Sequence, residues 1–294
     1  MNNRRTNYFL GSAFRYFTDK SCPYCSGRDV SVIDRKYVVT RLLECNQCHL
    51  YFRHPKDRPD FNKNFYQDEY EEFGITTHIP ERSLLEEYKK NNFKNSGKDF
   101  SPYIQIMQML RGKKDIKLVD YGTSWGYASF QFKKAGMQVQ SFEISRPMAR
   151  VGNELLDLDI QTDPQRLSPG NEVFFSSHVI EHVSDIRFML DNAKRLLSED
   201  GLFIACSPNG SKNYRERNPH TFNSLWGMVH PNFLNLDFYA HVFRDNPFII
   251  TSDPYNDLNI FSRWNHDAQI IDKTDGEELM VVCSINKRSG AVPS

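Results

Sequence analysis

The sequence lacks an excess of charge of either sign, and it has no long apolar run. Lysine plus arginine and aspartate plus glutamate each number 37 in 294 residues, so no overall charge draws the chain to nucleic acid or to an anionic membrane. No run approaches the roughly 18 apolar residues that a membrane-spanning helix needs. The N-terminal stretch MNNRRTNYFLGSAFRYF also lacks the continuous apolar core and cleavage site of a secretory signal. We therefore expect a cytoplasmic protein without a membrane span, for which nucleic acid is not a favoured partner.

Cysteine is also scarce, but its placement is informative. Four of the six cysteines form two CxxC pairs, CPYC and CNQC, with 19 residues between them. Two such turns can present four thiolates tetrahedrally to Zn²⁺, and the segment between them alternates like a pair of strands. The alternatives are weaker, because a redox pair needs only one CxxC in a βαβ context and a reducing cytosol disfavours disulfides. The sequence predicts a zinc ribbon whose structural ion is held by Cys22, Cys25, Cys45 and Cys48.

From residue 116 onward, segments typical of strands and of helices alternate. KLVDYG, QVQSFEIS, EVFFSSHVI and LFIACSPN fit strands, and helical spacing lies between them, including a helix over 185–201. This alternation predicts an α/β fold with a doubly wound, mostly parallel sheet and helices on both faces. We expect a zinc ribbon with an N-terminal extension at 1–56, a connector with helices at 57–112, and the main domain at 113–294.

The stretch KLVDYGTSWGYASF carries a glycine turn after the first strand of that sheet. In doubly wound sheets, ligands bind beyond the carboxyl ends of the strands, and Gly122 and Gly126 would let the backbone approach a ligand with no Cβ in the way. Glu143, at the end of the next strand, is positioned to accept two hydrogen bonds from a ribose diol. A dinucleotide fingerprint would need glycine at 124 and 127, where the chain has Ser124 and Tyr127, so the nicotinamide interpretation is rejected.

The remaining pattern resembles a known family. Asp120, Gly122, Ser124, Gly126 and Glu143 resemble the first two motifs of class I S-adenosylmethionine-dependent methyltransferases. FFSSHVIEHVSDIRFML looks like the fourth strand and following helix of a subfamily marked by an EHV segment, and MVHPNFLNLDFYAHVF is similar to that subfamily's histidine loop. CHLYFRHPKDRPDF likewise resembles the ribbon exit of its ribbon-bearing members. The resemblance covers nearly the whole chain.

The resemblance implies S-adenosylmethionine as the cofactor, held by a Rossmann-like sheet of seven strands. The residues that it implies at the cofactor are Asp120, Gly122, Thr123, Ser124, Gly126, Glu143, Ile144 and His178. Ser124 departs from the family pattern, because it adds a side chain where glycine is usual. The acidic residue that addresses the adenine has two candidates, Asp159 and Asp163.

Transfer of a methyl group to a hydroxyl requires a base, and histidine has a suitable pKa. Histidines stand at four positions expected to face substrate: His178, His182, His220 and His230. His178 ends the fourth strand, where an acceptor should enter, and His230 precedes PNFLN. Position favours these two, and we expect His178 or His230 to be the general base.

Three functions remain open. The resemblance implies a methyltransferase of the sugar, surface-polysaccharide or natural-product type, acting on a small polar acceptor such as a saccharide or a nucleotide-linked sugar. The alternatives are a ribosomal RNA methyltransferase that grips RNA through its ribbon, and a non-catalytic scaffold in which Ser124 marks a decayed site. The RNA alternative depends on a basic patch formed by Arg28, Arg35, Lys36 and Arg41. The acceptor atom, whether oxygen, nitrogen or carbon, and the oligomeric state are not determined by the sequence.

Overall fold

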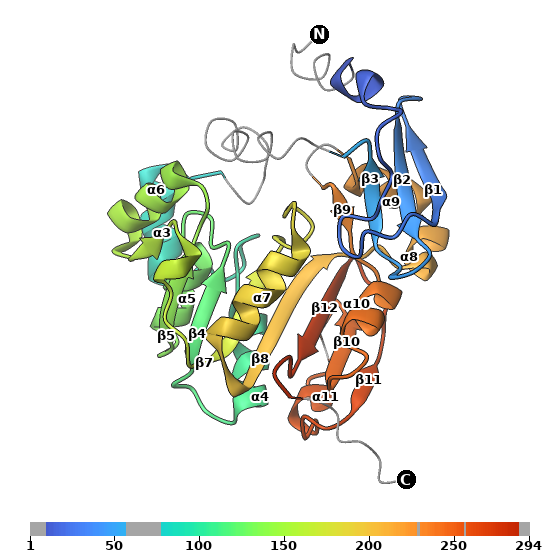
Figure 1. Cartoon of the computed structure of the whole chain (residues 1–294). Coiled ribbons are helices and arrows are strands. Elements are labelled where there is room, and N and C mark those ends of the chain that lie inside the picture. The colour runs from blue at the N-terminus through green and yellow to red at the C-terminus, as the bar shows by residue number, and fades with distance from the viewer. Residues whose placement is uncertain (1–9, 57–77, 228–229, 256, 288–294) are drawn as a thin grey trace, which may run out of the picture.

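The computed structural model describes residues 10–56, 78–227, 230–255 and 257–287, which form two sheets (Figure 1). The larger sheet contains β4 (Lys117–Tyr121), β5 (Gln138–Phe142), β6 (Ile160–Gln161), β7 (Asn171–Ser177), β8 (Leu197–Pro208), β10 (Phe248–Ser252), β11 (Gln269–Ile271) and β12 (Glu278–Cys283). Its strand order is β11-β10-β12-β8-β7-β4-β5-β6. Strands β8, β7, β4, β5 and β6 are parallel, and β12 is antiparallel to both β8 and β10. The order reverses between β4 and β7, which is where doubly wound sheets bind their ligands.

Helices cover both faces of this sheet, as the alternation of strands and helices predicts. One face packs against α3 (Arg82–Asn91), α4 (Ser101–Arg111), α5 (Tyr127–Lys134), α6 (Arg146–Leu156) and α11 (Asn259–Ser262). The other face packs against α7 (Ile186–Leu196) and α10 (Leu236–Val242). Three further helices are η3 (Pro164–Arg166), α8 (Lys212–Arg217) and α9 (Pro219–Leu225). The doubly wound α/β fold is therefore confirmed.

The strands are apolar on both faces because both faces are buried. Along β7, Val173 and Phe175 join the core on the α4 side, whereas Phe174 joins the core on the α7 side. Successive side chains of a strand point to opposite faces, so a strand covered on both sides needs an unbroken apolar run. Cys206 and Cys283 are buried within β8 and β12.

Two details of the prediction were wrong. The sheet has eight strands and not seven, because the short strand β11 adds a parallel edge to β10. The helix expected over 185–201 ends at Leu196, and β8 begins with the next residue. The apolar spacing of that segment does not mark the change, because Leu196 and Leu197 are both buried.

The smaller sheet has the order β1-β2-β3-β9 and is not confined to the N-terminal segment. It contains β1 (Val30–Lys36), β2 (Thr40–Cys45), β3 (Tyr51–His54) and β9 (Asn232–Phe233). The pairing of β1 with β2 confirms the strand pair expected between the two CxxC turns. Strand β9 comes from the C-terminal half of the chain and pairs with β3. Figure 1 shows the ribbon strands, in blue, beside α8, α9 and α10.

The ribbon shares a core with the larger sheet. Leu50 and Phe52 belong to the same buried cluster as residues of α7 and α10, and Tyr24 packs edge-on against Phe238 at 5.2 Å between ring centroids. The division at residues 56 and 112 stays a prediction, and residues 57–77 of the expected connector lie outside the described part of the chain. None of the described helices combines the length and apolarity that a bilayer crossing requires.

We expect Phe52→Ala to destabilise the whole chain. Phe52 is buried where β3 faces the main core, so truncation should leave a cavity and lower the free energy of unfolding by about 3–5 kcal/mol. Urea unfolding followed by circular dichroism measures this change. Tyr37→Ala is the control, because Tyr37 is 70% exposed and should change stability by less than about 0.5 kcal/mol. A Phe52→Ala protein as stable as the control would contradict the shared core.

Candidate functional site

The glycine turn after β4 is closed onto the end of β5. The backbone N–H groups of Gly122 and Thr123 both donate to the carbonyl oxygen of Phe142, at 2.8 and 3.0 Å. Gly126 then begins α5 in a left-handed conformation, with a φ of 85°. The turn and the end of β5 therefore form one rigid unit at the carboxyl edge of the sheet.

The protein's own packing requires glycine at both positions. A Cβ on Gly122 would lie 2.3 Å from Cγ2 of Val179, and a Cβ on Gly126 would lie 2.3 Å from Cδ1 of Leu158. Both residues also have positive φ, which favours glycine. Sequence reasoning explained these glycines by the approach of a ligand alone. The contact with Val179 also shows that the segment after β7 lies directly against the turn.

Ser124 combines a strained backbone with a buried hydroxyl that has no partner among the described residues. Its φ is 54°, a left-handed conformation that costs an L-residue about 1–2 kcal/mol. Its side chain is 7% exposed, and its Oγ has no hydrogen-bond partner among the described residues. The Nε1 of the neighbouring Trp125 is buried and equally without a partner in that part of the chain. Two unpaired donors at one turn are what a site for a polar ligand would leave.

Glu143 joins the turn to the start of α6. Its Oε2 accepts a hydrogen bond from the backbone N–H of Ser124 at 2.8 Å, and its Oε1 accepts one from that of Ser145 at 2.8 Å. Burial raises the pKa of Glu143 to about 7, the nearby charge of Asp120 adds to the rise, and the backbone N–H groups oppose it. Near neutral pH, the carboxyl group is therefore poised between its neutral and charged forms.

Asp120 lies beneath the turn and supports it. Its Oδ2 accepts a hydrogen bond from the hydroxyl of Ser129 in α5 at 2.6 Å, and that hydroxyl also lies 3.0 Å from Oγ1 of Thr123. Burial raises the pKa of Asp120 to about 6, and the hydrogen bonds from Ser129 and Thr123 oppose the rise. This network holds the first turn of α5 against β4.

Ile144 leaves an apolar side chain in solvent beside Glu143, with 46% of its surface exposed. The two candidates for the adenine contact have local partners. Asp159 accepts a hydrogen bond from the side chain of Gln161, and Asp163 caps η3 by accepting from the backbone N–H of Gln165. The geometry therefore does not choose between them.

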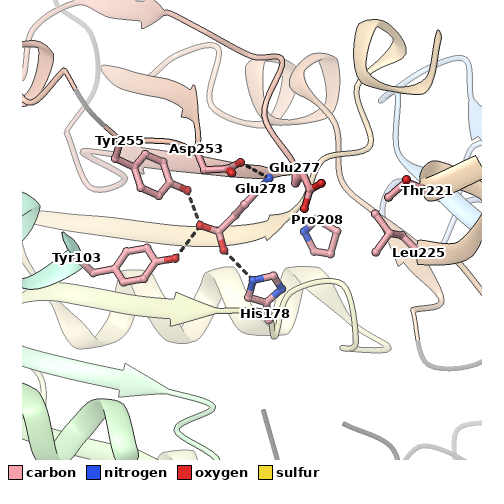
Figure 2. A pocket seen from close by; sticks show the side chains of 9 residues that line it. All are labelled: Tyr103, His178, Pro208, Thr221, Leu225, Asp253, Tyr255, Glu277 and Glu278. Carbon is pink, nitrogen blue, oxygen red and sulfur yellow. Dashed lines mark hydrogen bonds and ion pairs between the residues drawn. The ribbon is translucent and has the colours of Figure 1, made fainter. Parts of the chain in front are cut away.

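A pocket of about 350 Å³ opens over the ends of β7, β8 and β12 (Figure 2). Three carboxylate side chains face it from two segments, Asp253 and the pair Glu277 and Glu278. The other lining residues are Tyr103, His178, Pro208, Thr221, Leu225 and Tyr255. The pocket is thus acidic and aromatic, and His178 is its one titratable base among the described residues.

Glu278 is the centre of the polar network in Figure 2. Its carboxylate accepts hydrogen bonds from the hydroxyls of Tyr103 and Tyr255, and it pairs with Nε2 of His178 at 2.7 Å. Burial alone would raise the pKa of Glu278, but His178 and the two tyrosines outweigh burial and hold the pKa below its usual value. The sequence analysis missed Tyr103, Tyr255 and Glu278, because they come from three distant segments and carry no motif.

His178 lies between two carboxylates. Its Nε2 faces Glu278, and its Nδ1 lies 3.4 Å from Oε1 of Glu181. Burial would lower the pKa of His178, but its close pairing with the carboxylates of Glu181 and Glu278 outweighs burial and raises the pKa to about 10. The side chain is 44% exposed, so it is accessible from the pocket while it is paired.

The other predicted base, His230, stacks edge-on against His182 with 4.6 Å between ring centroids. His220 is exposed on α9 and apart from this group.

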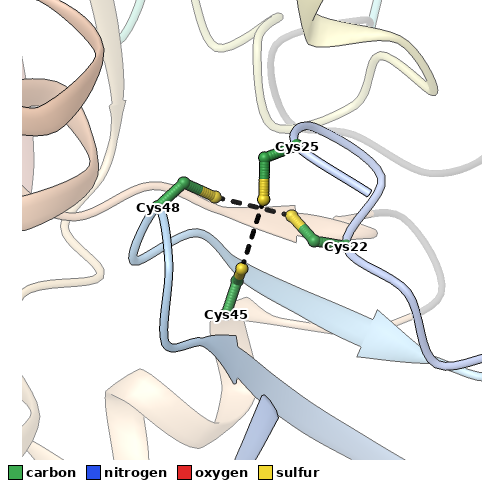
Figure 3. Close-up of side chains that lie close together, drawn as sticks. All are labelled: Cys22, Cys25, Cys45 and Cys48. Carbon is green, nitrogen blue, oxygen red and sulfur yellow. Dashed lines mark hydrogen bonds between the residues drawn. The ribbon is translucent and has the colours of Figure 1, made fainter. Parts of the chain in front are cut away.

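The four cysteines of the ribbon converge on one point (Figure 3). The Sγ atoms of Cys22 and Cys48 are 3.5 Å apart, and those of Cys25 and Cys45 are 3.4 Å apart. None of the four is in a disulfide. Four thiolates around one zinc ion at about 2.3 Å would have their sulfur atoms slightly under 4 Å apart. The geometry of the cluster fits a tetrahedral ion.

The ribbon sheet holds the C-terminal end of α9, which borders the pocket. Asp34 of β1 accepts hydrogen bonds from Nε1 of Trp226 at 2.9 Å and from the side-chain amide of Asn223 at 2.8 Å. Arg53 of β3 donates from Nη1 to the carbonyl oxygen of Gly227 at 2.8 Å. Because Leu225 lines the pocket from the end of α9, the ribbon shapes the pocket from outside. Nothing in the sequence pattern indicated this contact.

Comparison with known proteins agrees with this architecture. Residues 98–252, more than half of the chain, match a family described as a methyltransferase domain. Among solved structures, a SAM-dependent methyltransferase, possible histamine N-methyltransferase, from Thermotoga maritima is 14% identical, with 70% of this chain and 95% of that chain covered and a TM-score of 0.44. The plantazolicin methyltransferase BpumL in complex with SAH is 12% identical, with 76% and 95% covered and a TM-score of 0.49.

No curated protein matches the chain. The family match extends over α4, the glycine turn, Glu143 and His178 as far as the end of β10, and it ends before Tyr255 and Glu278 of the pocket. The chain belongs to the methyltransferase domain family, and it is a class I S-adenosylmethionine-dependent methyltransferase.

Proposed function

We propose that this methyltransferase acts on a hydroxyl group of a saccharide-type acceptor bound in the pocket beside His178. The supporting observation is the lining of the pocket, where Asp253, Glu277 and Glu278 offer carboxylate oxygens next to two tyrosine rings. Carboxylates accept hydrogen bonds from hydroxyl groups, and aromatic rings pack against the apolar faces of sugars. The proposal extends to nucleotide-linked sugars, but their phosphate groups would have to stay outside this acidic pocket.

The turn after β4 suits the cofactor. The residues proposed to hold it are Asp120, Gly122, Thr123, Ser124, Gly126, Glu143, Ile144 and His178. The fit is supported by the unpaired buried Oγ of Ser124, by Glu143 beside it and by the exposed apolar side chain of Ile144. When bound, S-adenosylmethionine supplies an electrophilic methyl group on a sulfonium centre. Asp120 would act by supporting the turn, since its side chain bonds to Ser129.

The arrangement of the two binding regions supports direct transfer. Val179 packs against Gly122, and the neighbouring His178 faces the pocket, so donor and acceptor would meet across one short segment. Holding two reactants in this way replaces a bimolecular encounter by a positioned one, and the protein need not supply a covalent nucleophile. Its residues must exclude water, orient the acceptor hydroxyl and accept its proton.

The geometry favours His230 over His178 as the proton acceptor. Both ring nitrogens of His178 face carboxylates, so this residue has no free lone pair and is better suited to position Glu278. In His230, Nδ1 donates to the carbonyl oxygen of Leu225, which leaves the lone pair of Nε2 available. We propose that His230 accepts the proton and that His178 orients the acceptor.

We also propose that the four ribbon cysteines hold a structural zinc ion. This ion would stabilise the small sheet, which binds the end of α9 beside the pocket.

The RNA alternative has less support, because two of the four basic residues on which it depends already have partners within the protein. The ammonium group of Lys36 bonds to the carbonyl oxygen of Trp226, and the guanidinium of Arg41 stacks on Tyr16 at 4.5 Å from the ring centroid.

The acceptor class is tested by incubating the purified full-length protein with S-adenosylmethionine and separate pools of free saccharides, nucleotide-linked sugars and RNA. Release of S-adenosylhomocysteine measures turnover. We expect turnover with a saccharide pool and none with RNA. Methylation of RNA alone, with salt-dependent binding, would overturn the proposal.

Glu143 should make cofactor affinity depend on pH. Ribose hydroxyls bond best to the charged carboxylate, and the pKa of Glu143 is about 7, so affinity for S-adenosylmethionine should rise about 10-fold between pH 6 and pH 8. Isothermal titration calorimetry measures this rise. Glu143→Gln should bind weakly at both pH values, and the exposed Glu154→Gln should behave as the unchanged protein. A pH-dependent rise that survives in Glu143→Gln would contradict the assignment.

The same group should act in the opposite direction on the stability of the cofactor-free protein. The pKa of Glu143 is raised from 4.5 to about 7, so burial disfavours the charged form. The free energy of unfolding should therefore fall as pH rises from about 4.5 through 7, with Asp120 adding a fall of the same sign. Urea unfolding between pH 5 and pH 8 should show a smaller fall in Glu143→Gln.

His178→Ala and His230→Ala should each lower methyl transfer at least about 100-fold, because one positions the acceptor and the other accepts its proton. Affinity for S-adenosylmethionine should stay close to normal in His230→Ala, which separates the acceptor side from the cofactor side. Steady-state kinetics with calorimetry of cofactor binding measures both effects. Unchanged turnover in both variants would show that neither histidine takes part.

A further inference from the structure

We propose that Glu181, His182 and His230 form a second metal site, which binds a divalent transition-metal cation through oxygen and nitrogen. One ligand atom from each residue lies within 4.8 Å of the other two. These residues share no ligand with the four cysteines of the ribbon. The sequence predicted a subfamily segment that contains Glu181 and His182, and it predicted His230 as a candidate base. Methyl transfer from S-adenosylmethionine does not by itself call for a metal ion.

Two segments distant in the chain build the site, and hydrogen bonds hold them together. Glu181 and His182 lie in the turn after β7, and His230 precedes β9. The backbone N–H of Asn232 donates to the carbonyl oxygen of Glu181 at 3.2 Å, and its side-chain amide donates to that of Val183 at 2.6 Å. The three ligands are therefore held in place without a metal.

The carboxylate of Glu181 is the observation that points to a cation. Its side chain is 0% exposed, and neither oxygen accepts a hydrogen bond from any residue that the structure describes. The nearest donors to Oε1 are Nδ1 of His178 at 3.4 Å and Nε2 of His182 at 3.9 Å. A buried carboxylate without hydrogen bonds is costly, and a coordinated cation is one of the few groups that compensate it.

The histidines present suitable nitrogen atoms. A carbonyl oxygen can only accept, so Nδ1 of His230 carries its proton toward Leu225, and the lone pair of Nε2 is directed elsewhere. A backbone carbonyl that orients a metal-binding imidazole in this way is a common feature of metal sites. The rings of His182 and His230 lie 4.6 Å apart at 62° between their planes, so small side-chain rotations would bring both nitrogens to one ion.

The ligand set selects the class of ion. Two imidazoles and one carboxylate suit Mn²⁺, Fe²⁺, Co²⁺, Ni²⁺ or Zn²⁺ and leave coordination positions open, whereas Mg²⁺ and Ca²⁺ prefer oxygen ligands alone. The absence of thiolate among these ligands separates the site from the ribbon, whose four sulfur atoms suit zinc.

The metal site borders the acceptor pocket, and this position suggests a role in activating the acceptor. That role rests on the function proposed above. His178 and Leu225 both line the pocket, and they contact Glu181 and His230 respectively. An acceptor hydroxyl bound at an open position would have its pKa lowered by the cation. Its proton leaves to solvent, the oxygen forms a bond to the methyl carbon, and the carbon–sulfur bond breaks to leave a neutral thioether. With the cation bound, the lone pair of His230 coordinates it, so the role of His230 as proton acceptor proposed above belongs to the protein without this cation.

Metal binding is tested on the full-length protein, with the ribbon loaded with zinc and without cofactor or acceptor. Titration with Co²⁺ should show one additional equivalent bound, with visible absorption that lacks sulfur-to-metal charge transfer. Glu181→Gln and His230→Ala should each weaken this binding at least 10-fold. His220→Ala is the matched control, because His220 is an exposed histidine outside the cluster, and its binding should be unchanged.

Equal Co²⁺ binding in the unchanged protein, Glu181→Gln and His230→Ala would overturn the site. If these variants do not fold, the unchanged protein still decides the question. Paramagnetic broadening of the His182 and His230 ring signals by Co²⁺ supports the site, and broadening of other histidines alone overturns it.

Measurements of activity distinguish three proposals: that the metal binds, that the metal activates the acceptor, and that the acceptor is a saccharide. Loss of turnover on removal of the nitrogen- and oxygen-bound ion, with recovery on adding Co²⁺ or Zn²⁺, supports metal activation of the acceptor. Full turnover without that ion, together with inactivity of His230→Ala, overturns the metal's role and leaves His230 as a simple base. Normal metal binding without turnover on any saccharide overturns the proposed function and leaves the site intact.

Discussion

Two buried carboxylates at the carboxyl edge of the sheet determine how the acceptor side of this enzyme is built. Glu181 and Glu278 face each other across His178, and each needs positive charge or hydrogen bonds to remain in a dry environment. Glu278 is satisfied by His178, Tyr103 and Tyr255, whereas Glu181 pairs with imidazole rings and accepts no hydrogen bond from the described part of the chain. The orientation of His178 and the gathering of Glu181, His182 and His230 follow from balancing these charges.

The ribbon supports the same edge of the larger sheet without lining the pocket. Strand β9 completes the ribbon sheet, and the four cysteines gather at one point of this segment. Asp34 and Arg53 of the same sheet bind Trp226 and Gly227. The ribbon therefore lies behind the end of α9, whose Thr221 and Leu225 line the pocket, and it supports the pocket without lining it.

The cofactor side depends on a different constraint, the left-handed turn after β4. Gly122 and Gly126 are required by close packing against Val179 and Leu158, and Ser124 adopts a conformation better suited to glycine. Ser124 nevertheless donates its N–H to Glu143, which keeps the carboxylate at the turn. The departure from the family pattern at this position thus changes a side chain while the backbone contacts of the turn stay in place.

Local pattern in the sequence was sufficient for the α/β class, the strand pair of the ribbon, the cysteine cluster and the glycine turn, because each depends on residues close together in the chain. It placed the end of α7 wrongly, because Leu196 and Leu197 are both buried across the boundary, and it missed β11, an edge strand of three residues that are not buried. Tertiary structure alone brought Glu278 and Tyr103 to His178, and His230 to Glu181. These groups meet because parallel strands end at one edge and because β9 crosses to the ribbon, and neither long-range pairing leaves a signal in a single sequence.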